Sequence, residues 1–313
     1  MADGAPWSGV GIALPCVDAL GRGTPVLEVA RAAEDAGLDH VWVPDHLVFH
    51  RPIIEATTAL ACVAGATDRI RLGTAILNPT LRPVVWLAKQ LMTLATLAPD
   101  RLLLGVGLGG EYEPEFRAAG FERNTRGRRL DEALELLPKL AAGERVVHGG
   151  AFEVDCDGLA PALDAFPPVL VGGRGDVAVR RAARFADAWF PMWLDPDEIG
   201  SSRARLGELA AEHGRPEPGV ALVAFVNICE DRASGEAHAA ELIRRQYGMP
   251  YERVSRWMLV GSAAEVTKRL AAYIAAGVQG FCLSPAHPRP IEQIHALVEV
   301  RAQLSAEVVA GEA

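Results

Sequence analysis

The stretch Ala36-Gly37-Leu38-Asp39-His40-Val41 joins the end of an amphipathic segment to the start of a short apolar run. Ala276-Gly277-Val278-Gln279-Gly280-Phe281 has the same form near the other end of the chain. A glycine directly after an amphipathic segment favours the left-handed conformation that ends a helix. Each stretch therefore predicts a helix-to-strand turn, and the pair indicates a repeating α/β unit.

Outward from these turns, the alternation of an apolar run and an amphipathic stretch occurs eight times along the 313 residues. The apolar runs, each a predicted strand, are Val10–Cys16, Val41–Pro44, Ile70–Leu77, Leu102–Val106, Val169–Val171, Ala188–Met192, Val220–Ile228 and Phe281–Leu283. A strand followed by a helix, repeated eight times, is the order that closes a parallel barrel. We therefore predict an α/β fold, a single (β/α)8 TIM barrel over residues 1–313 with loop insertions.

Two segments interrupt the repeat. The first lies near residues 143–168, where Val146–Val154 contains Gly149-Gly150 between two β-prone runs and predicts a β-hairpin. The second covers residues 248–261 and is rich in aromatic, methionine and arginine side chains. Two interpretations of the second segment remain open: a lid over a pocket, and a surface segment that packs on the barrel wall.

Composition excludes several classes of protein. The formal net charge of −9 argues against a nucleic-acid-binding surface. No apolar run reaches the roughly 18–20 residues that a membrane helix needs, and Met1–Pro6 has no basic segment, so we expect neither a membrane span nor a signal peptide. Five scattered cysteines without a C-x-x-C pair indicate reduced thiols in a cytoplasmic protein.

Chemistry in such a barrel is expected at the carboxyl ends of the strands. Asp45 and His46 follow the second strand directly. A histidine there could exchange a proton near neutral pH, and a neighbouring carboxylate could fix its tautomer. The alternative is a loop histidine that caps a backbone carbonyl. His50 makes a metal site conceivable, but the first strand lacks paired histidines, so no metal is expected.

The third and fourth strands end in small residues. Leu72–Thr80 closes with Asn78-Pro79, which indicates either a backbone close to a large flat group or a simple turn. Gly105–Gly110 resembles a dinucleotide fingerprint, but no helix opens directly after it, so a Rossmann fold is excluded. Glycines at a barrel mouth let a ring or a phosphate approach the main chain. Glu111 and Glu113 are then candidate acids or bases, or else solvated loop carboxylates.

The fifth strand is followed by Gly172-Gly173-Arg174-Gly175-Asp176 and then by a helical segment. A glycine-rich turn with an arginine at a helix N-terminus predicts a site for an anion such as phosphate. The negative charge of Asp176 opposes phosphate binding at this turn.

These segments together resemble the luciferase-like monooxygenase superfamily, the barrel family of bacterial luciferase and of the coenzyme F420-dependent oxidoreductases. The matching segments cover most of the chain. They are Glu34–Asp39, Val41–His46, Leu72–Pro79, Pro83–Leu91, Asp100–Leu102, Gly105–Tyr112, Glu115, Phe116, Gly120, Arg126, Glu132, Pro168–Arg174, Arg181–Arg184 and Asp187–Trp189.

The resemblance implies an oxidoreductase that transfers a hydride between coenzyme F420 and a small-molecule organic substrate. It implies that the cofactor lies in the barrel mouth with its phosphate toward the fifth-strand loop. His46 would then exchange a proton, oriented by Asp45, and Glu111 beside Gly110 would be a second proton-transfer group. The resemblance also implies a cis peptide bond between Ala75 and Ile76 that supports the ring.

On this basis we expect His46, Asp45 and Glu111 to be catalytic. The residues expected at the cofactor are Asp45, Ala75, Ile76, Asn78, Gly107, Gly109, Gly172, Gly173, Arg174 and Gly175.

Two other functions remain open within the resemblance. One is an FMN-dependent monooxygenase that uses reduced flavin and O2, and the other is a non-catalytic flavin-binding or partner subunit. Related barrels often dimerise through their second and third helices, and the apolar stretches Ala59–Gly65 and Leu87–Leu97 allow a homodimer of this kind.

Overall fold

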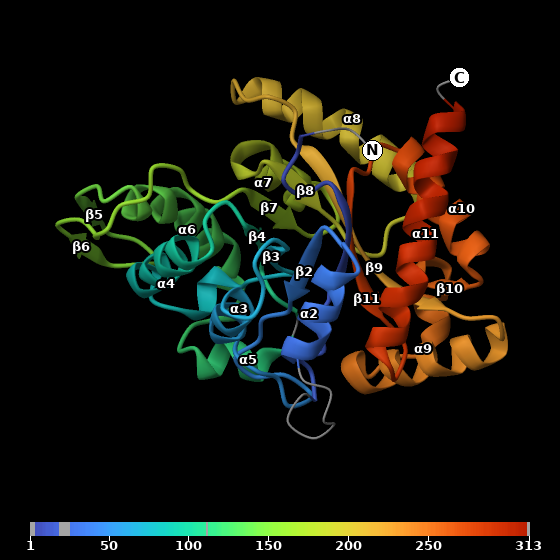
Figure 1. Cartoon of the computed structure of the whole chain (residues 1–313). Coiled ribbons are helices and arrows are strands. Elements are labelled where there is room, and N and C mark those ends of the chain that lie inside the picture. The colour runs from blue at the N-terminus through green and yellow to red at the C-terminus, as the bar shows by residue number, and fades with distance from the viewer. Residues whose placement is uncertain (1–3, 19–25, 111, 312–313) are drawn as a thin grey trace.

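The computed structural model describes residues 4–18, 26–110 and 112–311, with strands at the centre and helices around them (Figure 1). All eight predicted barrel strands are present. They are β1 (Gly9–Ala13), β2 (His40–Val43), β3 (Arg71–Thr74), β4 (Leu102–Val106), β7 (Val169–Gly172), β8 (Ala188–Phe190), β9 (Gly219–Ile228) and β11 (Gly280–Pro285). Neighbouring strands pair in parallel, and pairing of β8 with β9 closes the ring. The predicted (β/α)8 barrel is confirmed.

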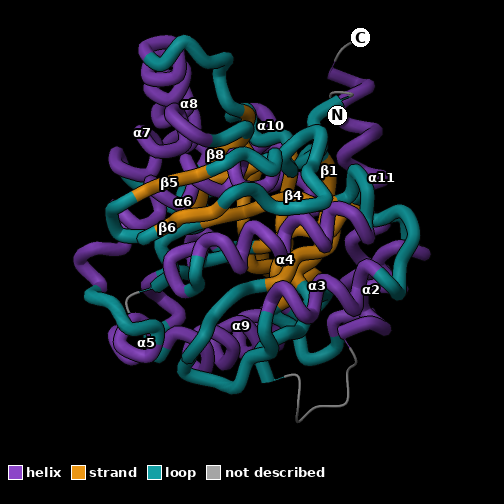
Figure 2. The backbone as a smooth tube through the Cα atoms, turned by 90° about the vertical axis from the view of Figure 1, so that its left-hand side faces the viewer, coloured by secondary structure: helices purple, strands orange, loops and turns teal. Residues whose placement is uncertain are grey.

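Helices follow the strands and cover the outside of the barrel (Figures 1 and 2). They are α2 (Val26–Asp35), α3 (Ala56–Ala64), α4 (Val84–Leu97), the short α5 (Glu113–Ala118), α6 (Arg126–Ala141), α7 (Asp176–Phe185), α8 (Pro196–Glu212), α9 (Arg232–Tyr247), α10 (Ala263–Ala275) and α11 (Pro290–Gly311). Gly37 and Gly277 both have positive φ, at 73° and 99°, in the two predicted helix-to-strand turns. A left-handed residue there lets the chain reverse into the next strand.

The barrel interior holds its own apolar cluster, separate from the larger core between strands and helices. Trp42 and Phe190 are its largest side chains, both almost fully buried, with ring centroids 5.0 Å apart. Inward-facing side chains of this kind fill a small barrel, so the interior is a packed core rather than a pore.

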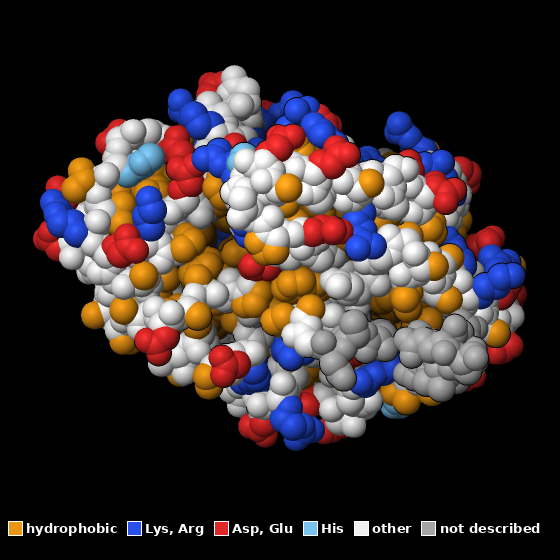
Figure 3. Space-filling view, turned by 90° about the horizontal axis from the view of Figure 1, so that it is seen from above, with side chains coloured by type: hydrophobic (Ala, Val, Ile, Leu, Met, Phe, Trp, Pro, Cys, Tyr) orange, Lys and Arg blue, Asp and Glu red, His pale blue; other side chains and the backbone are white. Residues whose placement is uncertain are grey.

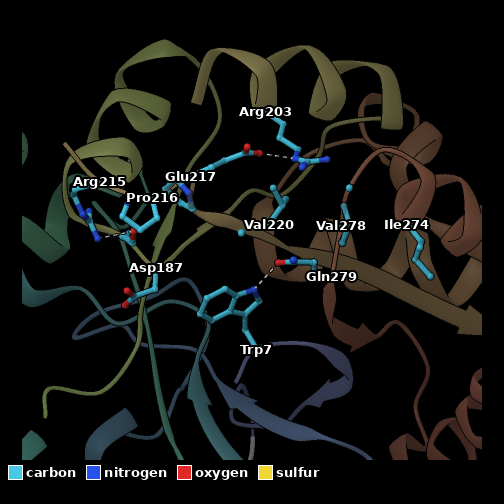
Figure 4. A pocket seen from close by; sticks show the side chains of 14 residues that line it. Trp7, Asp187, Arg203, Arg215, Pro216, Glu217, Val220, Ile274, Val278 and Gln279 are labelled. Carbon is cyan, nitrogen blue, oxygen red and sulfur yellow. Dashed lines mark hydrogen bonds and ion pairs between the residues drawn. The ribbon is translucent and has the colours of Figure 1, made fainter. Parts of the chain in front are cut away.

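The N-terminal end of the barrel is closed by Trp7, whose indole Nε1 donates to Gln279 Oε1 over 3.1 Å (Figure 4). The buried ring of His40 continues this contact inward: its Nδ1 accepts from Trp42 Nε1 (2.8 Å), and its Nε2 lies 3.2 Å from the Trp7 carbonyl oxygen. Burial lowers the pKa of His40 to about 4. Trp7 lines a hollow of about 590 Å³ at this end of the barrel. Arg203 and Glu217 also line this hollow and form an ion pair with each other.

The predicted hairpin is present as β5 (Val146–His148) and β6 (Val154–Cys156), which pair antiparallel. It projects to one side of the barrel beside α6 (Figure 1). The Arg129 guanidinium of α6 lies 4.4 Å from the ring centroids of both Phe121 and Phe152. Such a stacked cation holds two aromatic rings at fixed positions, so the hairpin is anchored to the loop that follows α5.

The second insertion packs on the barrel wall. After two single 3₁₀ turns, Tyr251–Arg253 and Ser255–Trp257, it forms β10 (Leu259–Gly261), an additional strand parallel to β9. Val254 and Met258 are buried against α9 and β9. This burial favours the second of the two alternatives, a segment packed on the barrel wall.

Acidic and basic side chains are interspersed on the face seen in Figure 3, with hydrophobic side chains between them. All five cysteines are free thiols. Within the described ranges, no helix combines the length and the apolar character needed to cross a bilayer.

Candidate active site

The mouth of the barrel has an apolar floor. Ala13, Ala75, Ile76 and Val223 lie on top of the interior cluster and remain partly exposed. Ala13 ends β1, and Ala75 and Ile76 follow β3, so these three stand at the carboxyl ends of their strands, where barrel enzymes bind their substrates, whereas Val223 lies within β9. A partly open, apolar floor of this kind can accept one face of a flat ring system.

His46 follows β2 at the carboxyl end of that strand and contacts a buried carboxylate of α5. Its Nδ1 is 3.1 Å from Glu115 Oε1 and 3.3 Å from Glu115 Oε2. The Leu47 amide N–H also donates to Glu115 Oε1 over 2.8 Å. The Glu115 side chain is fully buried, whereas that of His46 is 18% exposed. The pair therefore joins a buried acid to a histidine that solvent can reach.

Asp45 does not orient His46, which corrects the role that the sequence assigned to it. Its two carboxylate oxygens each accept from an Arg82 Nη atom over 2.6 Å, and Oδ2 also accepts from the Asn78 amide over 2.9 Å. Asp45 and His46, although adjacent in the chain, therefore reach different partners. Asp45 instead ties the loop after β2 to the loop after β3.

Arg82 links two carboxylates in this network, because its Nη2 also donates to Glu55 Oε1 over 2.8 Å. Burial opposes ionisation of Glu55, but hydrogen bonds from Arg82, Thr58 and Thr57 lower its pKa to about 2. Asp45 and Glu55 in turn raise the pKa of Arg82 against the effect of its burial. Glu55 and Arg82 are therefore charged at neutral pH, and Asp45, which is 4% exposed, has little surface for a ligand.

The end of β3 has the conformation that the family resemblance implies. The peptide bond between Ala75 and Ile76 is cis, as predicted. Leu77 rejoins the sheet by donating to the Gly105 oxygen over 2.7 Å. The Asn78 side chain is 1% exposed, accepts from the Thr80 amide and hydroxyl, and donates to the Leu108 oxygen. Ala75 and Ile76 thus line the mouth, whereas the Asn78 side chain belongs to a turn.

The glycines after β4 make room for this turn. A β-carbon at Gly107 would lie 2.0 Å from Ile76 Cδ1, and one at Gly109 would lie 2.5 Å from Asn78 Nδ2. A β-carbon at Gly172 would also be tight against Ile76, at 3.1 Å. These positions therefore have a packing reason to be glycine, and their contact with a cofactor stays a prediction.

Gly105 is also closely packed, whereas Gly110 is not, so the two glycines together test whether close packing requires glycine in this segment. We expect Gly105→Ala to lower the free energy of unfolding by about 3 kcal/mol, because its β-carbon would lie 2.0 Å from the Thr74 backbone oxygen. Gly110→Ala is the matched control, since nothing lies within 4 Å of a β-carbon there. Urea denaturation measures both variants, and equal destabilisation would contradict the packing role.

The turn after β7 is exposed, and two of its positions have a backbone conformation that favours glycine. Gly173 and Gly175 have φ of 119° and 95°, and α7 begins directly afterwards at Asp176. The first N–H groups of a helix have no intrahelical acceptor. Asp176 forms an ion pair with Arg180, so its charge is partly compensated. The Arg174 guanidinium lies 5.4 Å from the centroid of Trp193 and is available at the rim for an anion.

Of the predicted carboxylates after β4, Glu111 lies outside the described residues. Glu113 is exposed and pairs with Arg123 over 3.3 Å at the surface. The carboxylate that contacts His46 is Glu115, which the sequence interpretation did not select. The only signal for Glu115 in the sequence is its place in a segment that matches the family, because its partner lies 69 residues away.

The fold, together with the polar residues that follow the strands at the mouth of the barrel, defines a (β/α)8-barrel enzyme. A family model described as luciferase-like monooxygenase matches residues 17–280. The chain belongs to this family.

Curated relatives and solved structures agree with this assignment. An F420-dependent glucose-6-phosphate dehydrogenase from Beutenbergia cavernae is 31% identical over 279 residues, covering 78% of this chain and 82% of the relative. An uncharacterized protein from Mycobacterium tuberculosis is 32% identical over 213 residues, covering 61% of this chain and 73% of the relative.

Two solved structures share the fold at low sequence identity. An F420-dependent secondary alcohol dehydrogenase with an F420-acetone adduct has a TM-score of 0.84 at 20% identity and covers 95% of this chain and 99% of its own. The FMN-bound oxygenating constituent of 3,6-diketocamphane monooxygenase from Pseudomonas putida has a TM-score of 0.74 at 18% identity and covers 94% and 96%. The same barrel therefore accompanies both cofactors.

Proposed function

We propose that this enzyme is an oxidoreductase that transfers a hydride between coenzyme F420 and a small organic substrate. The observation that carries the proposal is His46, a partly exposed histidine that follows β2 at the carboxyl ends of the barrel strands and contacts a buried carboxylate. Several curated relatives with about 30% identity are named F420-dependent dehydrogenases, which supports F420 as the cofactor.

The residues present fit a deazaflavin. Ala75 and Ile76 supply an apolar surface for the ring, and the turn Gly173–Gly175 with Arg174 supplies N–H groups and a positive charge for a phosphate. When bound, F420 supplies the carbon that accepts or donates the hydride. The Asp45 carboxylate contributes indirectly, because its ion pair with Arg82 joins the loops after β2 and β3 that border the mouth.

Hydride transfer to or from an alcohol or carbonyl carbon must be matched by a proton at the oxygen. We assign this proton transfer to His46, because it is a titratable group after the carboxyl end of β2 and its ring is partly open to solvent. Its ring is stacked on Phe49, with centroids 4.1 Å apart and planes 15° from parallel, so the imidazole has a defined orientation.

Titration of the purified protein with oxidised F420 and with FMN tests the proposed cofactor. We expect F420 to bind with a Kd in the micromolar range, measured by quenching of its fluorescence, and FMN not to bind up to about 100-fold higher concentration. An Arg174→Ala variant should weaken F420 binding about 10-fold, since it removes one cation from the phosphate site.

The other outcomes of this titration identify the alternatives. FMN binding without F420 binding would contradict the proposal and support an FMN-dependent monooxygenase, the alternative favoured by the FMN-bound structure that shares the fold. Binding of neither cofactor would support a non-catalytic partner subunit.

The homodimer and the cytoplasmic location indicated by the sequence stay predictions. The surface on which a second copy would lie comprises the outer faces of α3 and α4. Trp86 and Leu97 on α4 are 68% and 61% exposed, and Cys62 on α3 is also exposed. Large exposed apolar side chains on adjacent helices are typical of contact surfaces.

A further inference from the structure

We propose that Glu115 is a positioning residue that holds one tautomer of His46, so that the proton is exchanged at Nε2. The catalytic consequence of this inference rests on the proposed function. The tautomer itself does not, and it can be measured in the protein without cofactor.

The surroundings of Glu115 show that its carboxylate serves His46. The side chain is fully buried, and its Oε1 atom accepts from the amide of Leu47 and lies 3.1 Å from Nδ1 of His46. An ionised carboxylate only accepts hydrogen bonds. A bare Nδ1 lone pair would also be an acceptor, and two acceptors in contact repel each other, so the contact of this carboxylate with His46 requires a proton on Nδ1.

This requirement determines which ring nitrogen reacts. With Nδ1–H donated to Glu115, a neutral His46 carries its lone pair on Nε2 and accepts a proton there. A protonated His46 keeps Nδ1–H and releases the proton from Nε2. Glu115 therefore allows the imidazole to act as base and as acid through the same atom, without reorientation of the ring.

Two further contacts restrict the geometry of the pair. The Leu47 amide binds the same Oε1 atom that lies nearest to His46, so the carboxylate is tied to the loop that carries the histidine. Phe49 covers one face of the imidazole. Because Glu115 stands on α5 and His46 follows β2, the contact also joins the strand ends of β2 and β4.

Glu115→Gln is the decisive variant, because it keeps the shape of the side chain. A glutamine offers both an oxygen and an N–H group, so it no longer forces a proton onto Nδ1. We expect kcat to fall at least about 10-fold, with the Kd for F420 and the substrate KM changed less than about 3-fold. The solvent deuterium isotope effect on kcat should rise, because proton transfer becomes slower.

The second measurement is ¹⁵N NMR of the histidine rings in the cofactor-free protein at pH 9, where an ordinary imidazole is neutral. A His46→Asn sample identifies the His46 signals among the eight histidines. We expect a protonated Nδ1 and an unprotonated Nε2 in the wild type, and a mixture of tautomers in Glu115→Gln. Glu122→Gln, which removes an exposed carboxylate seven residues later, is the control and should change neither the spectrum nor kcat.

The outcomes separate this inference from the proposed function. His46 signals that are unchanged in Glu115→Gln, or a wild-type His46 protonated at Nε2 alone, would overturn the positioning role whatever the activity. A tautomer that depends on Glu115 in an enzyme that does not need His46 for turnover would support the positioning role and contradict the proposed function.

Discussion

Replacement of His46 by alanine is expected to lower kcat about 1,000-fold while the Kd for F420 changes less than about 3-fold. The ring of His46 is the partly exposed end of a buried acid–histidine pair, so its removal deletes proton transfer and leaves the apolar floor intact. Turnover is measured by the absorbance of F420 with secondary alcohols and sugar phosphates as trial substrates. Cofactor binding is measured separately by fluorescence quenching.

His213→Ala provides the matched control, because this histidine is exposed at the end of α8 and should leave kcat within about 2-fold of wild type. A parallel loss of F420 affinity and turnover in His46→Ala would assign His46 to binding only. An unchanged kcat would refute its role in proton transfer.

A second large effect is expected on stability between pH 7 and pH 4. Burial, the largest influence, lowers the pKa of His40 from 6.5 to about 4, while Asp39 raises it and Arg71 lowers it by smaller amounts. The unfolded chain therefore binds a proton at a higher pH than the folded chain does. Stability is complete above about pH 6.5 and falls as the pH drops toward 4, by about 3 kcal/mol from this group.

His40→Gln isolates this contribution. Its amide can accept from Trp42 Nε1 and donate to the Trp7 oxygen, the two contacts of the neutral imidazole, and it does not titrate. Urea unfolding at pH 7, 5.5 and 4 should show a smaller loss of stability in His40→Gln than in the wild type, with a difference of about 3 kcal/mol. Carboxylate titration is common to both proteins and cancels, so identical pH dependence would falsify the explanation.

The barrel could be predicted from the sequence because each strand is a short apolar run and each turn carries local signals. Gly37 and Gly277 act within a few residues of their own position, and the structure places both as predicted. The strand β10 was not predicted. Its three residues lie inside an insertion and pair only with the end of β9, so no local pattern indicates them.

Only the location of the site, and not the contacts between its residues, could be predicted from the sequence. That His46 stands at the mouth follows from its position after a strand, and the cis bond at Ala75–Ile76 follows from the family resemblance. The partners do not follow, because Glu115 and Arg82 come from distant parts of the chain. Sequence adjacency favoured Asp45 as the partner of His46, yet Asp45 binds Arg82 and His46 contacts Glu115.

The cation stack of Arg129 has a consequence beyond the hairpin that it anchors. Phe121, one of the two rings, also meets Phe116 of α5 edge-on with centroids 5.7 Å apart, and Phe116 directly follows Glu115. A series of contacts thus connects Phe152 in the hairpin, through Arg129 and Phe121, to Phe116, the residue next to Glu115. We therefore expect a substitution of Phe152 in the hairpin to change the packing of the residue next to Glu115 while leaving the barrel strands unchanged.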